Sequence, residues 1–255
     1  YWNERYLNDD FGWDLGEVST PLKHYIEQLN NKDLKILIPG AGNSYEAEYL
    51  FKLGFKNVYV LDFAEAPLLN IKKRIADFPS HQLIQQDFFE HQGNYDFIIE
   101  QTFFCALPPT MRQKYVWKMH QLLANKGKLV GLLFNREFEV SPPFGGSLNE
   151  YKQLFKSTFQ MLKIATAKNS ISARLNSELF IEFEKNQDII VNLYHFEGIT
   201  CSGCMNTVSS KFLEIDSVDN VSMNRNFSEI IIVSKSEIDI KILQKIVSYD
   251  EKYKI

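Results

Sequence analysis

The chain has 255 residues, of which 45% are hydrophobic, and its formal net charge is −4. This length allows one sizeable core and a small second module, and a negative chain without a Lys/Arg-rich stripe argues against a nucleic-acid binder. The longest apolar runs, such as Leu129–Phe134, are far too short to span a bilayer, and no secretory hydrophobic region is seen near Tyr1.

Strand-like and helix-like segments alternate through the first 187 residues. The predicted strands are Lys35–Ile38, Asn57–Leu61, Gln82–Gln86, Tyr95–Glu100, Lys128–Phe134, Met161–Thr166 and Leu179–Glu184. The predicted helices, with apolar residues at helical spacing, are Tyr45–Leu53, Pro67–Phe78, Pro109–Leu123 and Leu148–Phe159. Such alternation predicts an α/β domain with a mostly parallel sheet and helices on both faces.

A different pattern follows the polar bridge Lys185–Asp188. Its predicted elements are a strand Ile189–Phe196, a helix Cys204–Phe212, strands Val218–Met223 and Glu229–Val233, a helix Asp239–Val247 and a last strand Tyr253–Ile255. The order βαββαβ is the ferredoxin-like plan of a small α+β domain. We therefore expect two domains, 1–187 and 188–255.

The segment Ile36–Ser44 is an apolar strand that enters a Gly-x-Gly turn, and Asp62 ends the next apolar strand. Glycines allow the backbone to approach a ligand closely, and an acid at the tip of the second strand can accept hydrogen bonds from both ribose hydroxyls. The pattern predicts a site for an adenosine cofactor. A NAD site or a structural turn remains an alternative for this motif alone.

Three further features favour S-adenosylmethionine over NAD. Glu46 stands where a dinucleotide fold has its third glycine. Asp87 follows the third strand, where it can pair with the adenine amino group while Phe88 stacks on the ring. The fourth strand ends in Glu100–Pro109, at the place where a methyltransferase holds the methionine part and receives its substrate.

Ordered motifs along residues 1–184 resemble the thiopurine, thiol and halide methyltransferase family. They are Tyr1–Tyr6 with Gly12–Gly16, Ile38–Gly42, Leu61–Glu65, Asp87–Phe89, Phe103–Leu107 and Pro142–Phe144. The resemblance implies a Rossmann-like class I methyltransferase fold with a seven-stranded, mostly parallel sheet. Ala41 and Asn43 depart from it, since the family usually has cysteine and glycine there.

The resemblance also implies roles for single residues. Trp2, Tyr6 and Trp13 would enclose the cofactor from an N-terminal lid, although the plant enzymes usually carry tryptophan where Tyr6 stands. Gly40 and Gly42 would pass beneath the cofactor, and Asp62 would bind ribose. Asp87 and Phe88 would hold adenine, and Gln101 and Thr102 would line the far side of the methionine. The tryptophans could instead be ordinary core aromatics, since large aromatic side chains usually supply burial.

The sequence gives little guidance on the methyl acceptor. A dry apolar chamber is expected from Phe11, Phe103, Phe104, Pro143 and Phe144. Arg136 and Tyr151 are the polar residues expected nearest to a substrate anion, with a structural role as the alternative. Cys105 lies in an apolar run, where a thiol behaves as a small hydrophobe, and no catalytic residue is assigned.

The segment Gly198–Met205 contains a Cys-x-x-Cys pair, Cys201 and Cys204, and resembles the metal loop of heavy-metal-associated domains. A thiolate at a helix N-terminus is favoured by backbone N–H groups, and two thiolates suit Cu(I), with Zn possible if further ligands join. A redox pair or a structural pair are the alternatives. With only three cysteines in the chain, this usage points to a reducing compartment, so we expect a cytoplasmic protein.

Two classes of function follow from these patterns. The first is a methyltransferase that uses S-adenosylmethionine and acts on a small soft nucleophile such as a thiol, thiopurine, halide, or selenium or metalloid species, with a module for a soft metal ion. The second is a metal-binding or metal-sensing protein whose first domain binds S-adenosylmethionine without turnover. We expect a monomer with a small-molecule acceptor and no nucleic-acid or membrane partner.

Overall fold

The computed structural model describes residues 1–223 and 227–255. It forms two compact units, Tyr1–Asn186 and Gln187–Ile255. In the first unit the strands are β1 Lys35–Pro39, β2 Asn57–Asp62, β3 Leu83–Gln85, β4 Tyr95–Gln101, β5 Leu123–Phe134, β6 Phe159–Thr166 and β7 Glu178–Lys185. Its α-helices are α1 Trp2–Leu7, α2 Thr20–Ile26, α3 Tyr45–Lys52, α4 Glu65–Arg74, α5 Arg112–Leu122 and α6 Leu148–Phe155.

The strands of the first unit form one seven-stranded sheet in the order β3-β2-β1-β4-β5-β7-β6. Strands β1 to β5 pair in parallel, and β7 runs antiparallel to both β5 and β6. The predicted mostly parallel sheet is confirmed. Chain direction across the sheet reverses at β1, which pairs with β2 on one side and β4 on the other, and ligands bind beside such a switch point at the carboxyl ends of the strands.

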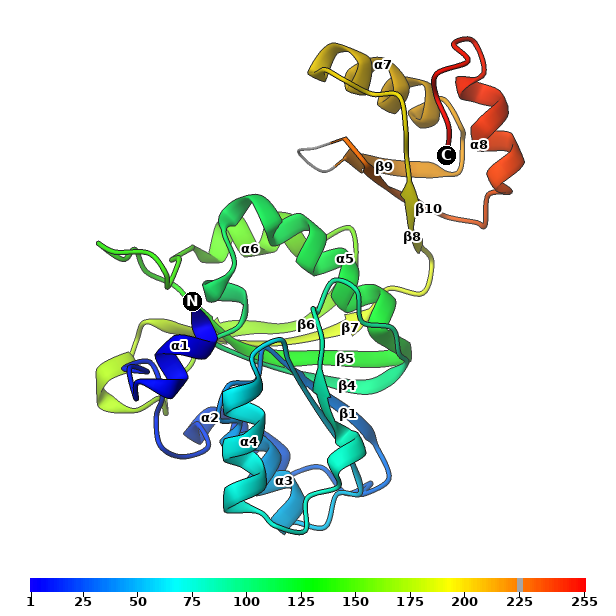
Figure 1. Ribbon diagram of the computed structural model, residues 1–255. Coiled ribbons are helices and arrows are strands. Elements are labelled where there is room, and N and C mark those ends of the chain that lie inside the picture. The colour runs from blue at the N-terminus through cyan, green and yellow to red at the C-terminus, as the bar shows by residue number, and fades with distance from the viewer. Residues whose placement is uncertain (224–226) are drawn as a thin grey trace. The chain divides into compact units, whose positions relative to one another are not determined.

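Helices cover both faces of this sheet (Figure 1). On one face α2, α3 and α4 bury residues such as Leu22, Leu50 and Ile71 against the strands, and on the other α5 and α6 bury Tyr115 and Phe155. Each face therefore has its own apolar core, and the sheet is a rigid platform between them.

The N-terminal region differs from its prediction. No helix or strand was predicted before Lys35, but Trp2–Leu7 and Thr20–Ile26 are helices. Both are short, so they offer few turns in which an apolar period could be recognised. The helix predicted over Pro67–Phe78 begins earlier, at Glu65, and ends at Arg74, because Ile75 leaves the helical conformation and the chain returns to the core through the buried Phe78.

The second unit contains β8 Ile190–His195, α7 Ser202–Leu213, β9 Val218–Met223, β10 Glu229–Ser234 and α8 Ile240–Val247. Its three strands form an antiparallel sheet in the order β8-β10-β9, and residues such as Phe212, Ile230 and Leu243 make its core. The strand predicted at Tyr253–Ile255 is reduced to a single bridge between Lys254 and Glu197.

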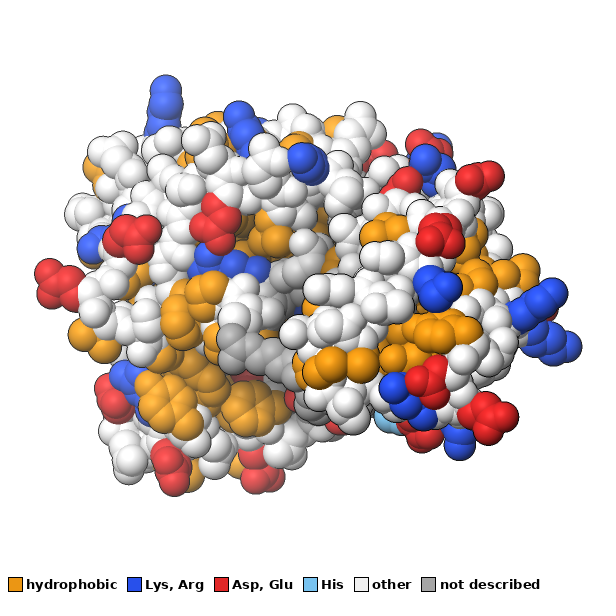
Figure 2. Space-filling model, turned by 90° about the horizontal axis from the view of Figure 1, so that it is seen from above, with side chains coloured by type: hydrophobic (Ala, Val, Ile, Leu, Met, Phe, Trp, Pro, Cys, Tyr) orange, Lys and Arg blue, Asp and Glu red, His pale blue; other side chains and the backbone are white. Residues whose placement is uncertain are grey.

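The described part of the chain has no helix that is long and apolar enough to cross a membrane. On the face drawn in Figure 2, Lys and Arg side chains are interspersed with Asp and Glu, and hydrophobic side chains lie among them.

Candidate active site

A cavity of about 330 Å³ opens at the carboxyl ends of β1, β2 and β4. The N-terminal segment, the Gly-x-Gly turn and the segments after β3 and β4 supply its walls. All ten residues assigned to cofactor binding from the sequence line this one cavity: Trp2, Tyr6, Trp13, Gly40, Gly42, Asp62, Asp87, Phe88, Gln101 and Thr102. They come from five separate segments of the chain, so the fold brings together residues that lie far apart in the sequence.

The two glycines of the turn are required by conformation and by space. Both adopt positive φ angles, 54° at Gly40 and 51° at Gly42. A Cβ atom on Gly40 would lie 2.0 Å from the Phe103 ring, and one on Gly42 would lie 2.2 Å from the Tyr6 hydroxyl. The turn is therefore lined by two aromatic side chains, which no other residue type at these positions would allow.

Asp62 ends β2 beneath the turn and is 8% exposed. Its Oδ2 accepts a hydrogen bond from the Gly42 N–H at 3.0 Å, and its Oδ1 accepts one from the Ala64 N–H at 2.9 Å. Burial raises the pKa of this carboxyl group, and these backbone donors oppose that rise. Each oxygen still has a lone pair to offer, so Asp62 can also accept from ligand hydroxyls.

Asp87 and Phe88 follow β3 at another edge of the cavity. The Asp87 Oδ1 accepts from the Phe89 N–H at 2.8 Å, and the Phe88 ring lies edge-on to Phe103 with ring centres 5.0 Å apart. Behind them the buried His91 ring lies 2.9 Å from the Gln86 Oε1, which fixes the segment on its outer side.

The segment after β4 forms a tight turn. Thr102 has a φ of 60°, its hydroxyl donates to the Gln101 carbonyl at 2.7 Å, and the Cys105 thiol donates to the Thr102 carbonyl at 3.2 Å. Burial raises the pKa of the Cys105 thiol, with the nearby Glu100 charge adding to the effect. Cys105 is thus held as a neutral thiol, as expected for a cysteine that is not a nucleophile.

Aromatic side chains of the N-terminal segment cluster over the cavity. The Trp13 ring lies edge-on to Trp2 at 5.3 Å and to Tyr6 at 5.8 Å between ring centres. The Arg5 guanidinium lies 4.5 Å from the centre of the Trp13 ring and is paired with Asp10. A cation over an indole face adds a favourable electrostatic contact to this cluster.

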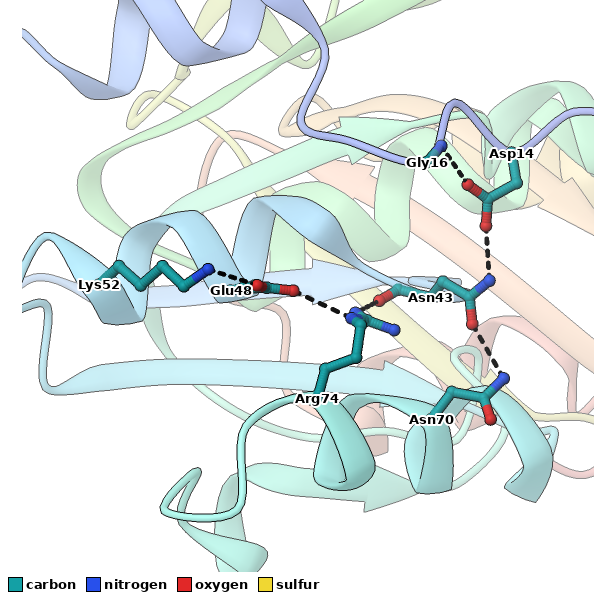
Figure 3. A network of polar contacts seen from close by, with 7 residues as sticks. All are labelled: Asp14, Gly16, Asn43, Glu48, Lys52, Asn70 and Arg74. Carbon is teal, nitrogen blue, oxygen red and sulfur yellow. Dashed lines mark hydrogen bonds and ion pairs between the residues drawn. The ribbon is translucent and has the colours of Figure 1, made fainter.

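A polar network ties this segment to the glycine turn (Figure 3). Asp14 accepts hydrogen bonds from the Gly16 N–H and the Asn43 side-chain amide. The Asn43 Oδ1 accepts from Asn70 on α4 at 3.1 Å, and its carbonyl accepts from Arg74. We call the Asp14–Asn43–Asn70 chain the latch. Sequence reasoning missed it, because Asn43 was noted only as a departure from the glycine common in related enzymes.

Four charged lining residues were also not predicted: Arg5, Asp14, Glu17 and Glu46. With Asp62 and Asp87, they give the cavity five carboxylates and, among the described residues, one cation, Arg5. The surplus of negative charge suits a ligand with a positive charge. The acid-rich N-terminal stretch and the acid at position 46 were visible signals of it.

Several residues expected near the acceptor do not line the cavity. The Tyr151 hydroxyl donates to the Phe134 carbonyl at 2.6 Å, and Arg136 lies over the Phe138 ring. Of the predicted apolar chamber only Phe103 and Pro143 line the cavity, and Phe11, Phe104 and Phe144 do not. The actual apolar wall consists of Phe103, Cys105, Ala106, Leu107, Met111, Pro142 and Pro143.

In the second unit, Cys201 precedes α7 and Cys204 lies in its first turn. The two sulfur atoms are 3.2 Å apart, and the Cys201 Sγ accepts from the Cys204 N–H at 3.4 Å. The Cys201 thiol lowers the pKa of Cys204, and the Tyr253 hydroxyl and Lys252 lower it further. The described residues contain no group of three or more His, Cys, Asp or Glu side chains that could hold a metal ion.

Comparison with known proteins gives a consistent result for the first unit. The family model of thiopurine S-methyltransferase matches residues 1–187. Probable thiol methyltransferase 2 of Arabidopsis thaliana is 27% identical over 181 residues, which is 68% of this chain and 80% of that protein. Thiopurine S-methyltransferase of Vibrio parahaemolyticus is 26% identical over 173 residues, 61% of this chain and 80% of its own.

A solved structure shares the fold. The 1,6-didemethyltoxoflavin-N1-methyltransferase of Burkholderia thailandensis superposes with a TM-score of 0.59 at 14% identity, covering 73% of this chain and 86% of its own. The first unit therefore has the Rossmann-like fold of class I methyltransferases.

Proposed function

The chain belongs to the thiopurine S-methyltransferase family and is an S-adenosylmethionine-dependent methyltransferase, and from this premise we propose that its acceptor is a small soft nucleophile. The acceptor classes we propose are thiols, thiopurines, halides, and selenium or metalloid species. The observation that carries this proposal is the single cavity lined by all ten predicted cofactor residues, with an apolar wall beside them.

We propose that the cofactor lies along the carboxyl edge of the sheet. Asp87 and Phe88 would hold adenine, Asp62 would accept from the ribose hydroxyls, and Gln101 and Thr102 would line the methionine part. Trp2, Tyr6 and Trp13 would close over it. The fit is supported by charge, because S-adenosylmethionine has a net positive charge, with a sulfonium and an ammonium group against one carboxylate, and the cavity has five carboxyl groups against one cation.

The residues of the apolar wall determine what can react. Bound S-adenosylmethionine supplies an electrophilic methyl group. Phe103, Leu107 and Met111 exclude water from the space beside it, and alignment of two reactants in a dry site is worth several powers of ten in rate. The apolar wall, as the described residues form it, carries no His, Lys, Asp or Glu side chain that could take a proton from an acceptor placed against it, so an acceptor that is already ionised, or that ionises easily, is favoured over one that needs a base.

A panel of acceptors tests the proposal. Release of S-adenosylhomocysteine should be measured with hydrogen sulfide, methanethiol, a thiopurine, iodide, thiocyanate and selenide, with and without Cu(I). We expect turnover with at least one soft acceptor and none with amines or alcohols of the same size. Turnover with oxygen or nitrogen nucleophiles instead would contradict the acceptor class while leaving the family unchanged.

We also propose that the second unit is a ferredoxin-like, heavy-metal-associated domain that binds Cu(I), with 1–187 and 188–255 as the functional division of the chain. The support is the close sulfur pair at the start of α7 and the Tyr253 hydroxyl and Lys252 that stabilise the Cys204 thiolate. Two thiolates favour a soft ion, whereas structural Zn needs about four ligands. Cu(I) titration against a competing chelator tests this, and affinity should rise with pH because both thiols must lose protons.

The alternative of a protein that binds S-adenosylmethionine without turnover is not favoured, because family membership points to catalysis. The cytoplasmic location and the monomeric state stay predictions.

A further inference from the structure

Glu100 is a fully buried carboxylate directly behind the cavity. It lies in β4 one residue before Gln101, and none of its surface is exposed. Its Oε1 accepts hydrogen bonds from the backbone N–H groups of Phe103 at 2.8 Å and Phe104 at 2.9 Å. Its Oε2 accepts from the Tyr115 hydroxyl. Burying a carboxylate is costly, and three donors converging on one side chain offset part of that cost.

The segment that Glu100 holds is the turn after β4. This turn supplies Gln101, Thr102 and Phe103 to the cavity wall. Its backbone includes the positive φ of Thr102, a conformation that is unfavourable for a non-glycine residue and persists only where neighbouring contacts enforce it. The two residues directly after Thr102, Phe103 and Phe104, donate their N–H groups to Glu100, and these bonds can hold Thr102 in this conformation.

The surrounding packing transmits the position of Glu100 to the cavity. The Tyr115 ring lies 5.9 Å from Phe103 and 5.8 Å from Phe88 between ring centres. Phe103 in turn lies against Gly40 of the glycine turn. On the other side, Gly131 of β5 pairs with Glu100, and a Cβ there would lie 2.4 Å from the Glu100 Cβ. A displaced Glu100 would therefore move two walls of the site.

We propose that Glu100 is a positioning residue for methyl transfer, whose ionised carboxylate holds the turn 101–104 in the shape that binds the methionine end of the cofactor. The inference rests on the proposed cofactor position in this cavity. Glu100 does not line the cavity, so it acts through the turn and not by touching the reactants.

The charge state of Glu100 links this role to pH. Burial raises its pKa to about 7, and the Tyr115 and backbone donors oppose that rise. The titratable groups that face it are the Tyr115 hydroxyl and the Cys105 thiol, with the Tyr151 hydroxyl at longer range, and burial raises the pKa of all three. They stay neutral near pH 7, so the change in charge there belongs to Glu100.

Glu100→Gln is the direct test, because glutamine has the shape of the protonated acid. Affinity for S-adenosylhomocysteine should be measured by calorimetry, and kcat/KM for S-adenosylmethionine with an acceptor that does not titrate, such as iodide or thiocyanate, between pH 5.5 and 8.5. We expect both the affinity and the kcat/KM of the variant to match those of the parent near pH 5.5. At pH 8.5 both should be about 10-fold lower than in the parent, because the variant lacks the charge-assisted hydrogen bonds of the ionised carboxylate. Its own pH profile should be flat.

Tyr115→Phe supplies a second, independent variant. It removes one donor to the ionised form, so the midpoint of the pH profile should move upward while turnover at high pH is retained. The matched controls are Glu182→Gln and Tyr25→Phe. The Tyr25 hydroxyl donates a hydrogen bond of 2.9 Å to Glu182, and neither residue lines the cavity. Both controls should keep the parent profile.

The outcomes separate this inference from the proposed function. If the parent binds S-adenosylhomocysteine and folded Glu100→Gln has the same affinity, turnover and pH profile as Glu182→Gln, the positioning role is wrong. An unmoved midpoint in Tyr115→Phe would overturn it even if Glu100→Gln failed to fold. If Asp62→Ala leaves the parent's affinity for S-adenosylhomocysteine unchanged, the cofactor position itself is wrong.

Discussion

The cofactor cavity is formed by residues from distant parts of the chain, whereas the cysteine loop is formed by residues that are neighbours in the sequence. The cavity draws on segments as distant as Trp2 and Pro143, and buried groups such as Asp62 and Glu100 hold it. In the loop, the two proposed metal ligands Cys201 and Cys204 lie at the start of one helix. A site built from distant segments depends on the whole fold, whereas a site built within four residues depends on two side chains. Substitutions should therefore act widely in the first and locally in the second.

The largest expected effect tests the independence of the two sites. Replacing Cys201 and Cys204 together by serine should abolish Cu(I) binding, because a hydroxyl is a poor ligand for a soft ion. Turnover of a good soft acceptor should stay within about two-fold of the parent, since neither cysteine lines the cavity. Chelator competition and the release of S-adenosylhomocysteine measure the two properties on one sample. A collapse of turnover in a folded double variant would place the cysteine loop in the catalytic cycle.

A second prediction concerns Glu100, the buried carboxyl group behind the cavity, which has no counterpart in the cysteine loop. The pKa of Glu100 is raised to about 7 from an ordinary value near 4.5, so folding is favoured by its protonated form. Its contribution to stability is complete below pH 4.5 and is lost as pH rises through 7, by about 3 kcal/mol in total. Glu100→Gln removes this dependence. The free energy of unfolding of the parent should therefore fall relative to the variant by about that amount between pH 4.5 and 8.

Urea unfolding of both proteins at matched pH values gives this difference. Glu182→Gln serves as the control. Partial burial acts to raise the pKa of Glu182, but the hydrogen bonds from Lys128 and Tyr25 together lower it, so its contribution to stability changes with pH in the opposite direction. A constant difference between parent and Glu100→Gln across the range would show that the buried carboxylate keeps an ordinary pKa.

The same contrast explains which parts the sequence could predict. The mostly parallel sheet, the glycine turn, Asp62, Asp87 and Phe88 were predicted from strand periodicity and from short motifs that carry their own chemistry. The count of seven strands and the roles of Trp2, Tyr6, Trp13, Gln101 and Thr102 were implied by the family resemblance. Strand ends of a parallel sheet meet at one edge, so motifs at strand ends predict a shared site.

What the sequence did not predict depends on long-range packing. Tyr151 lies near the end of β5, yet its hydroxyl donates to the Phe134 backbone and away from the cavity. The latch joins Asp14, Asn43 and Asn70, three polar residues whose contact depends on how the N-terminal segment folds back. Local sequence patterns do not show which way a side chain points or which residues far away in the sequence it contacts. The helices α1 and α2 are too short to show an apolar period, so the fold of the N-terminal segment could not be predicted.

Asp62 tests the cavity at its most predictable point. Asp62→Ala removes both carboxylate oxygens and should weaken binding of S-adenosylhomocysteine by about 1.5–3 kcal/mol, roughly 10- to 150-fold, the range for hydrogen bonds to charged groups. Asp62→Asn keeps one oxygen and should lose less. Calorimetry on folded protein measures both. Equal affinities in parent and alanine variant would remove Asp62 from the site.

The smallest expected effect concerns the latch, in which two part-buried hydrogen bonds connect the N-terminal segment to the glycine turn and α4. Asn43→Ala removes the side-chain amide that donates a hydrogen bond to Asp14. The free energy for opening the N-terminal segment should fall by about 1 kcal/mol, which raises the opening equilibrium constant about five-fold. Trypsin cleavage after Arg5 should accelerate by that factor, and S-adenosylhomocysteine should slow cleavage in the parent. Asn70→Ala removes only the second bond of the latch and keeps the Asp14–Asn43 bond, so it should accelerate cleavage less than Asn43→Ala does. Equal cleavage rates in parent and Asn43→Ala would mean that the aromatic cluster around Trp13 holds the segment without the latch.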